Sequence, residues 1–245
     1  MTVIALGSAK ASPGVTTTAV MLAAAWHHPD VVIVEADPDG GDLVARYALP
    51  PEPGLVTAAA AARRSADPVE FRRHLQALPG NIAVVPGPPA ADQAHAALAA
   101  GAFLADAVRA LHPATVLVDC GRLRIESPTR PLLDVADMVL VVARPRLDEV
   151  HHLAHLVRAA QAVPPDRDRV GLVCVGSKPY APDEVAVTIG VQLVGVVADD
   201  AVAADVLRSG RGSPRLLRRS PLARSAVTVA ERLADLSGEP RTSVA

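Results

Sequence analysis

Lysine and threonine side chains lie in a loop that follows the first apolar run of the sequence. Residues 3–6 lead into this loop, which contains Lys10, Gly14, Thr16 and Thr17 before an Ala- and Leu-rich helical pattern begins. Backbone N–H groups at the start of a helix, together with a lysine and a hydroxyl group, can hold a phosphate. The segment therefore predicts a phosphate-binding loop between a first strand and a first helix.

Two aspartates follow later apolar runs. Asp37 comes after residues 31–34, and Asp119 comes directly after residues 116–118. Continuous β-branched runs are typical of strands that are buried on both faces of a parallel sheet. Because the carboxyl ends of parallel strands meet at one edge of a sheet, both carboxylates can converge on the loop. Either aspartate could instead be an ordinary turn residue, and Lys10 an ordinary solvated lysine.

Strand and helix patterns alternate along the whole chain. Further strands are predicted at residues 82–85, 138–142, 170–175 and 193–197, and helices at residues 16–26, 90–111, 147–162, 202–208 and 222–236. Residues 50–79 are predicted to form a loop and helix excursion without a strand. The alternation predicts a single-domain α/β fold, a mostly parallel sheet with helices on both faces, over residues 1–237. Residues 238–245 are expected to be a flexible C-terminal tail.

The composition excludes several classes of protein. Half of the 245 residues are hydrophobic, which excludes a disordered chain, and the net charge of −2 excludes a polycation. Aromatic residues make up 2%, so a base-stacking platform is not expected. Cys120 and Cys174 cannot form a disulfide framework and are expected to be reduced core residues of a cytoplasmic protein. The sequence shows neither a signal peptide nor an apolar run long enough to span a membrane.

Four separated motifs resemble the ParA/MinD family of P-loop ATPases. The family's loop reads K-G-G-x-G-K-T-T, and residues 10–17 read K-A-S-P-G-V-T-T. Residues 31–41 (VVIVEADPDGG) resemble the family's second motif, and residues 115–119 (TVLVD) resemble its Walker B strand. Residues 135–145 (VADMVLVVARP) resemble the strand that follows, and residues 193–200 and 209–236 resemble the C-terminal pattern. Residues 119–130 look more like the TadZ/CpaE branch, which localises pilus machinery, than like chromosome-partitioning ParA.

The resemblance implies a fold, two cofactors and a role for each matching residue. It implies a P-loop NTPase that binds ATP and Mg²⁺ and dimerises around nucleotide. Thr16 and Asp119 would hold Mg²⁺, Thr17 would bond the α-phosphate, and Asp37 would orient the attacking water. Lys10 would reach the partner subunit's nucleotide. The nucleotide-binding positions are Lys10, Ala11, Ser12, Pro13, Gly14, Val15, Thr16 and Thr17.

The loop departs from the family's pattern at its most important position. Val15 replaces the lysine that bridges the β- and γ-phosphates, Pro13 removes a backbone N–H, and Ala11 and Ser12 replace glycines. Losing one charged contact costs about 1.5–3 kcal/mol, or roughly 10- to 100-fold in affinity. The family also reads adenine with an asparagine where residues 175–177 are Val-Gly-Ser. We therefore expect a positioning or partitioning protein with a degenerate site and weak or absent ATP hydrolysis. The alternative is a non-catalytic scaffold that recruits a protein partner.

A cluster of arginines and a cluster of histidines could each bind a ligand or could simply be exposed to solvent. Six arginines and no acid lie between residues 206 and 224, and they form either a nonspecific DNA-binding patch or a solvated loop. The arginines are Arg208, Arg211, Arg215, Arg218, Arg219 and Arg224. His151, His152 and His155 could contribute to a zinc site, but a solvated helix face is the better interpretation. No basic amphipathic tail follows the last helix, so a MinD-type membrane anchor is not expected.

Overall fold

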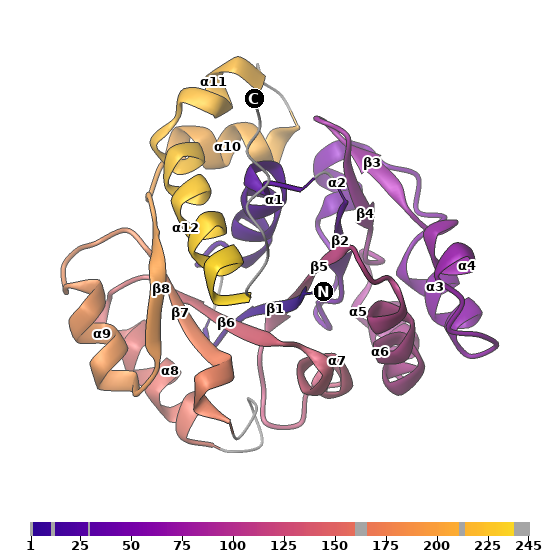
Figure 1. The fold of residues 1–245 in the computed structure, drawn as a ribbon, viewed down its shortest axis with the longest axis horizontal. Coiled ribbons are helices and arrows are strands. Elements are labelled where there is room, and N and C mark those ends of the chain that lie inside the picture. The colour runs from indigo at the N-terminus through magenta and orange to yellow at the C-terminus, as the bar shows by residue number, and fades with distance from the viewer. Residues whose placement is uncertain (1, 11–12, 29, 160–165, 211–213, 238–245) are drawn as a thin grey trace.

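The fold is an eight-stranded sheet between two layers of helices (Figure 1). The computed structural model describes residues 2–10, 13–28, 30–159, 166–210 and 214–237. The strand order is β3-β4-β2-β5-β1-β6-β7-β8, and β3 alone is antiparallel to its neighbour among these strands. The strands are β1 (Thr2–Ser8), β2 (Val31–Glu35), β3 (Gln76–Leu78), β4 (Ile82–Val85), β5 (Thr115–Arg122), β6 (Met138–Ala143), β7 (Val170–Val175) and β8 (Gln192–Val197).

Each face of the sheet has its own apolar core. Alternate residues of β1 divide between them, because Val3 and Ala5 pack on one side while Ile4 and Leu6 pack on the other. The first layer contains α3 (Leu55–Ala62), α4 (Pro68–Arg72), α5 (Ala91–Leu98), α6 (Gly101–Ala110), α7 (Arg130–Val135), α8 (Leu147–Arg158) and α9 (Pro182–Ile189). The second contains α1 (Val15–Ala25), α2 (Leu43–Tyr47), α10 (Ala201–Ser209), α11 (Pro214–Arg219) and α12 (Pro221–Ser237).

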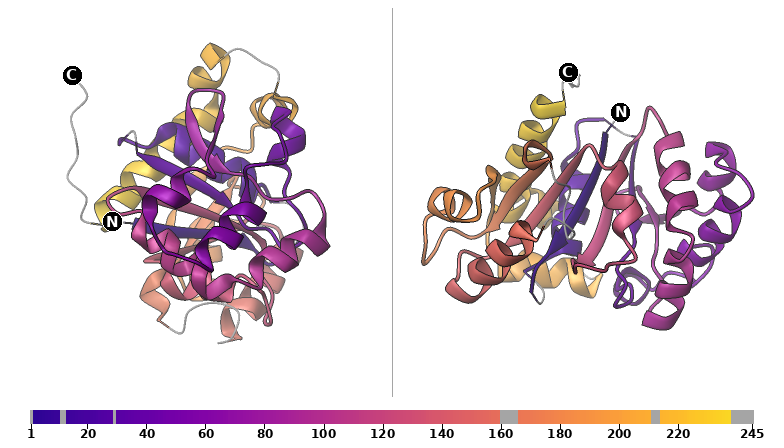
Figure 2. Two further views of the ribbon diagram at one scale, coloured as in Figure 1. Left: turned by 90° about the vertical axis from the view of Figure 1, so that its right-hand side faces the viewer. Right: turned by 90° about the horizontal axis from the view of Figure 1, so that it is seen from below.

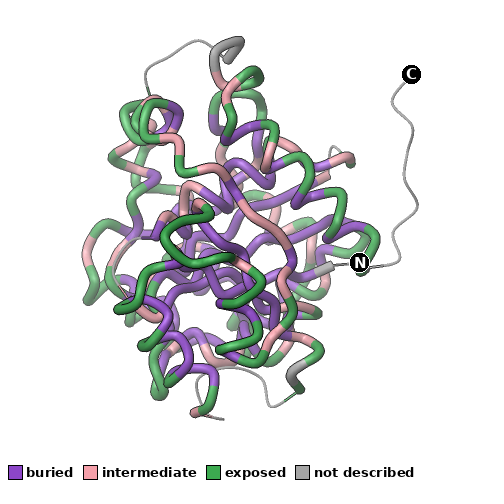
Figure 3. The backbone as a smooth tube through the Cα atoms, turned by 90° about the vertical axis from the view of Figure 1, so that its left-hand side faces the viewer, coloured by how far each residue is buried: buried purple, intermediate pink, exposed green. Residues whose placement is uncertain are grey.

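The two layers enclose the strands from both sides, as the end-on view shows (Figure 2). Buried backbone follows the strands and the inner faces of the helices, while exposed backbone lies on the outside (Figure 3). The predicted single-domain, mostly parallel α/β fold is therefore confirmed. The described helices include none that is both long and apolar enough to cross a membrane. Residues 238–245, predicted to be a flexible tail, lie outside the described residues.

Two predictions about the elements are wrong. Residues 90–111 form two helices, α5 and α6. Gly101 is the first residue of α6, and an added Cβ there would lie 2.9 Å from the Pro131 ring. Residues 50–79 do contain a strand, β3, which forms a hairpin with β4. Gly80 and Asn81 turn this hairpin with positive φ values of 87° and 62°, and glycine and asparagine adopt such backbone more readily than other residues. The predicted helix at 147–162 ends at Arg158 as α8, and residues 160–165 lie outside the described part.

Candidate functional site

The P-loop segment runs from the carboxyl end of β1 to the first turn of α1. Gly14 is the N-cap residue of α1, with φ 107° and ψ 36°, values that glycine tolerates. No side chain caps this helix and its first turn contains no acidic residue. The positive end of the α1 dipole therefore faces the loop, and the first turn itself contributes no carboxylate that would neutralise it. Thr16 and Thr17 are half-buried in this turn, whereas Ala11 and Ser12 lie outside the described residues.

Val15 is part of the apolar core. Its side chain is 6% exposed and packs in the cluster that α1 shares with α12. A valine at this position contributes packing where the family's lysine would contribute charge. Pro13, which is also buried, contributes no backbone N–H to the loop. The first turn of α1 thus retains its hydroxyl groups and dipole but lacks a cation of its own.

Asp119 is completely buried beside this turn. Its Oδ1 accepts the Gly121 N–H at 3.0 Å, and its Oδ2 has no hydrogen-bond partner. Burial raises the pKa of this carboxyl, and the neighbouring Thr16 hydroxyl acts in the opposite direction. A buried carboxylate oxygen without a partner, next to a threonine hydroxyl, is a donor set that suits Mg²⁺. Thr16 and Asp119, the predicted metal residues, are therefore brought together and fit that ion.

The strand that contains Asp119 does not end there. β5 continues to Arg122, and its register with β1 shifts because Leu6 pairs with Asp119 but Ser8 pairs with Arg122. The extra residue makes an irregularity of the kind that redirects side chains near functional sites. Gly121 lies in it with φ 56°. The prediction that this strand ends at Asp119 is wrong, because the bulge lets pairing resume beyond it.

Asp37 lies against this irregularity. It follows β2 by two residues, and a Cβ built on Gly121 would overlap the Asp37 carboxyl group. Its Oδ1 accepts the Asp39 N–H at 2.8 Å. Burial, with a smaller contribution from the charge of Asp119, raises the pKa of Asp37 to about 6. The two predicted aspartates therefore converge at one edge of the sheet, as expected.

Sequence analysis missed Glu35, which holds this acidic side together. The last residue of β2 is 1% exposed and pairs in register with Asp119. Its Oε1 accepts the N–H groups of Asp42 and Leu43 at 2.7 and 3.1 Å, and its Oε2 accepts that of Gly87 at 2.8 Å. Burial, and then the charge of Asp119, raise the pKa of Glu35 to about 8. A signal for Glu35 was present in the sequence, because this acidic residue directly follows the apolar run of residues 31–34.

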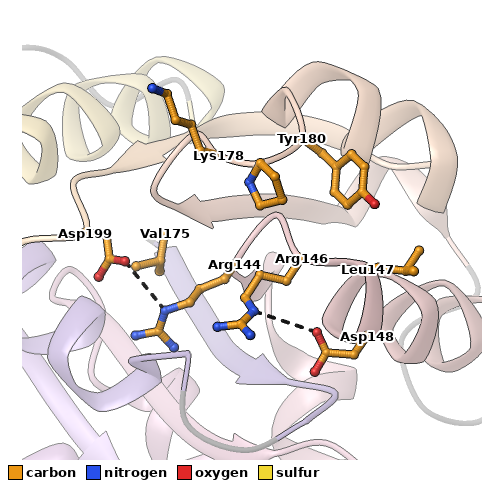
Figure 4. Close-up of a pocket in the computed structure, with 9 residues that line it drawn as sticks. Arg144, Arg146, Leu147, Asp148, Val175, Lys178, Tyr180 and Asp199 are labelled. Carbon is orange, nitrogen blue, oxygen red and sulfur yellow. Dashed lines mark ion pairs between the residues drawn. The ribbon is translucent and has the colours of Figure 1, made fainter.

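The other side of the P-loop is basic. Lys10 pairs with Asp148 at 3.3 Å, and the Arg146 guanidinium lies 3.9 Å from the same aspartate. Arg144 lies 3.9 Å from Asp199. Figure 4 shows both guanidinium groups in a pocket of about 510 Å³ at the carboxyl ends of β6, β7 and β8. Sequence analysis missed both arginines, although the Arg-Pro-Arg sequence directly follows a predicted strand.

The predicted DNA-binding arginines lie elsewhere. Arg218 and Arg224 border a separate apolar cavity of about 430 Å³, which is lined by the C-terminal half of α1. Arg208 pairs with Asp205 at 3.3 Å, and Arg224 donates to the Arg219 carbonyl oxygen at 2.6 Å. Arg211 lies outside the described residues, as does the side chain of Arg215. Of the described arginines, Arg218 and Arg224 thus lie beside the C-terminal half of α1 rather than beside its first turn.

The remaining candidate residues have structural explanations. His151, His152 and His155 are exposed on α8, and no potential metal-binding group of three or more residues occurs among the described residues. Cys120 and Cys174 are both buried, and burial raises the pKa of each thiol. Neither cysteine has the exposed, cation-assisted setting of a reactive thiol. The solvated helix face and the inert core cysteines agree with expectation.

Solved structures match the chain over almost its whole length. A ParA family ATPase from Chlorobium tepidum superposes with a TM-score of 0.79, 20% identity, and coverage of 95% of this chain and 98% of that one. The chain has the ParA/MinD-like fold. The septum site-determining protein MinD of Pyrococcus horikoshii, complexed with Mg-ADP, gives a TM-score of 0.75 at 16% identity, covering 99% of each chain. An McdA complex with ATP from Cyanothece gives 0.68 at 16% identity, covering 100% and 99%. No family model matches the sequence, and a search of curated proteins finds no significant match.

Proposed function

We propose that this protein is a nucleotide-dependent positioning or partitioning factor that binds ATP with Mg²⁺ at the P-loop. The observation that carries the proposal is the orphan Oδ2 of buried Asp119 beside Thr16, at the start of an uncapped helix. A buried carboxylate oxygen without a hydrogen-bond partner is costly inside a protein, and a bound cation offsets that cost. The ParA/MinD-like fold supports the same assignment, since its relatives include MinD with Mg-ADP and McdA with ATP.

Each residue of the site has a defined task in this proposal. The first turn of α1 binds phosphate through its N–H groups and dipole, and Thr16 and Asp119 hold Mg²⁺. The ion, when bound, neutralises charge that develops on the transferring phosphoryl group. Asp37, whose pKa of about 6 leaves it ionised at neutral pH, orients the attacking water. Glu35 positions Asp37 by fixing the loop that follows it.

Lys10 is expected to take part in nucleotide-dependent dimerisation. In the single chain this lysine pairs with Asp148, and both side chains are about half exposed, at 40% and 53%. An exposed ion pair is worth little, so Lys10 can leave it to reach a partner subunit's nucleotide. Sedimentation velocity with ATP and Mg²⁺ tests this step. We expect a dimer with ATP, a monomer with ADP, and a monomer for Lys10→Ala under both conditions. A chain that stays monomeric with ATP contradicts the proposed dimerisation.

A non-catalytic scaffold of the same fold is the second candidate. The buried valine at position 15 favours it, because slow or absent hydrolysis follows from a missing phosphate-bridging charge. Single-turnover hydrolysis of radiolabelled ATP separates the two candidates. Product formation that disappears in Asp37→Asn supports an ATPase. Tight ATP binding without hydrolysis supports the scaffold.

A further inference from the structure

The turn after β6 brings a second positively charged segment to the P-loop. β1 and β6 are parallel neighbours, and Gly7 pairs with Val141 near their carboxyl ends. Lys10 and Arg144 each follow that pair by three residues. The two segments therefore leave the sheet edge at the same level and side by side. Residues after β6 can reach a ligand that is held at the P-loop.

Backbone contacts fix this turn before any ligand binds. The Arg144 N–H donates to Glu149 Oε2 at 2.8 Å, and the Arg146 N–H donates to the Arg144 carbonyl oxygen at 2.8 Å. The Val150 N–H then donates to the Arg146 carbonyl oxygen at 2.9 Å, which begins α8. Both arginines are thus mounted on an ordered turn and helix start. Preorganised groups lose less conformational freedom when they bind a ligand.

Each guanidinium group has a distant carboxylate as an ion-pair partner. Arg144 and Arg146 lie 3.9 Å from Asp199 and Asp148, and the Arg146 side chain is 63% exposed. Guanidinium groups bind phosphate oxygens at about 2.7–2.9 Å, often through two parallel hydrogen bonds. For Arg146, exchange of this long, solvated carboxylate contact for a phosphate contact is therefore favourable.

We propose that Arg144 and Arg146 form a phosphate-binding site that supplies the positive charge missing at Val15. The inference rests on the proposed function, because its ligand is the polyphosphate of a nucleotide held at the P-loop. The pocket volume of about 510 Å³ is ample for such a group. Lys178 also lines the pocket, but its ammonium group points away from the two guanidinium groups (Figure 4). The two arginines therefore carry the site.

Calorimetry with Mg²⁺ and two probes, ATP and inorganic tripolyphosphate, tests this site. We expect the double variant Arg144→Gln/Arg146→Gln to bind both probes about 10- to 100-fold more weakly than the unmodified protein. Arg73→Gln is the matched control, because Arg73 is an exposed arginine that pairs with Glu70 at 2.8 Å. Its affinity should not change. Thermal melts of every variant establish that each is folded.

A second variant, Asp199→Asn, guards against a merely structural role for the arginines. Removing the carboxylate that now pairs with Arg144 should tighten tripolyphosphate binding by about 1.5- to 5-fold. Weaker binding by this variant overturns the inference. So does ATP binding that is unchanged in the double arginine variant, and in that case the proposed function survives. If the folded, unmodified protein binds neither probe at millimolar concentration, both proposals fail.

Discussion

One side of the P-loop has acidic side chains and the other has basic side chains, and the two are held in place by different means. On the side of β2 and β5, Glu35 and Asp119 are fully buried carboxylates, and backbone N–H groups and close glycine contacts fix their surroundings. On the side of β6 and β7, Arg144 and Arg146 are partly exposed and have distant carboxylate partners. The comparison teaches that the site separates two tasks. A rigid acidic side suits a metal ion and a water, and an adaptable basic side suits phosphate.

The largest effect on stability is expected when a methyl group is added to Gly121, on the acidic side of the P-loop. Gly121→Ala should destabilise the protein by more than about 3 kcal/mol, because left-handed backbone costs alanine about 1–2 kcal/mol and its Cβ would displace Asp37. Gly80→Ala is the control, since Gly80 also has a positive φ, of 87°, but no atom lies within 4 Å of the added Cβ. Urea unfolding measures both. Equal losses at the two glycines would show that the Asp37 contact is unimportant.

Restoring a lysine should strengthen the basic side. Val15→Lys should tighten ATP binding by about 10- to 100-fold, because it returns a charged contact to the phosphates. Val15→Met controls for length and apolar packing at this buried position. Calorimetry with Mg²⁺ compares the two variants. If lysine and methionine give the same affinity, the loop backbone rather than the missing charge limits binding.

The acidic side should also make stability depend on pH. The pKa of Asp37 is raised to about 6 in the folded protein, so between about pH 4 and 6 the folded state binds more protons than the unfolded state. Stability contributed by this group is therefore lost as pH rises through that window. In the absence of nucleotide, we compare the free energies of unfolding of Asp37→Asn and the unmodified protein. The difference should shift in favour of the variant by about 1–2 kcal/mol from pH 4.5 to pH 7.5, after allowance for partial exposure. Urea unfolding at both pH values measures the gain, and a constant difference would contradict the burial argument.

The smallest effect concerns the arginines remote from the P-loop. Arg218→Ala with Arg219→Ala should weaken duplex DNA binding and reduce its log–log salt slope by about 0.9 for each lost phosphate contact. ATP affinity should stay the same, because these residues lie at α11 rather than beside α1's first turn. Fluorescence anisotropy at several salt concentrations gives the slope. Absence of any DNA binding by the unmodified protein at about 50 mM salt would eliminate this role.

Sequence patterns predicted most of the sheet because its inner strands are buried on both faces and read as unbroken apolar runs. β3 was missed because three residues on a sheet edge carry little pattern, although the Gly80-Asn81 turn was a usable signal. The predicted helix at 90–111 was wrong because the alanine-rich sequence gives little local signal for the break between α5 and α6, which lies just before Gly101. The helix α9 was also missed, although Pro182, Asp183 and Glu184 are residues that favour the start of a helix.

The site was predicted where a motif marked it and missed where tertiary contacts define it. Asp37 and Asp119 follow apolar runs, so their convergence could be expected from parallel topology. Glu35 was missed because only the folded loops bring the N–H groups of Asp42 and Gly87 to its carboxylate. Arg144 lies in a segment that resembles the family's strand, but the resemblance gives neither Arg144 nor Arg146 a role. Their position beside the P-loop depends on the pairing of β1 with β6.

The measurement that tests the central claim most directly is calorimetry of ATP binding with and without Mg²⁺, for the unmodified protein and for Asp119→Asn. Asparagine keeps the shape of the buried side chain and removes a charge that burial disfavours, so the variant should fold. We predict that Mg²⁺ strengthens ATP binding at least about 10-fold in the unmodified protein, the effect of one charged contact, and has no effect in Asp119→Asn. No binding at millimolar ATP with Mg²⁺, or the same Mg²⁺ dependence in both proteins, would contradict the account.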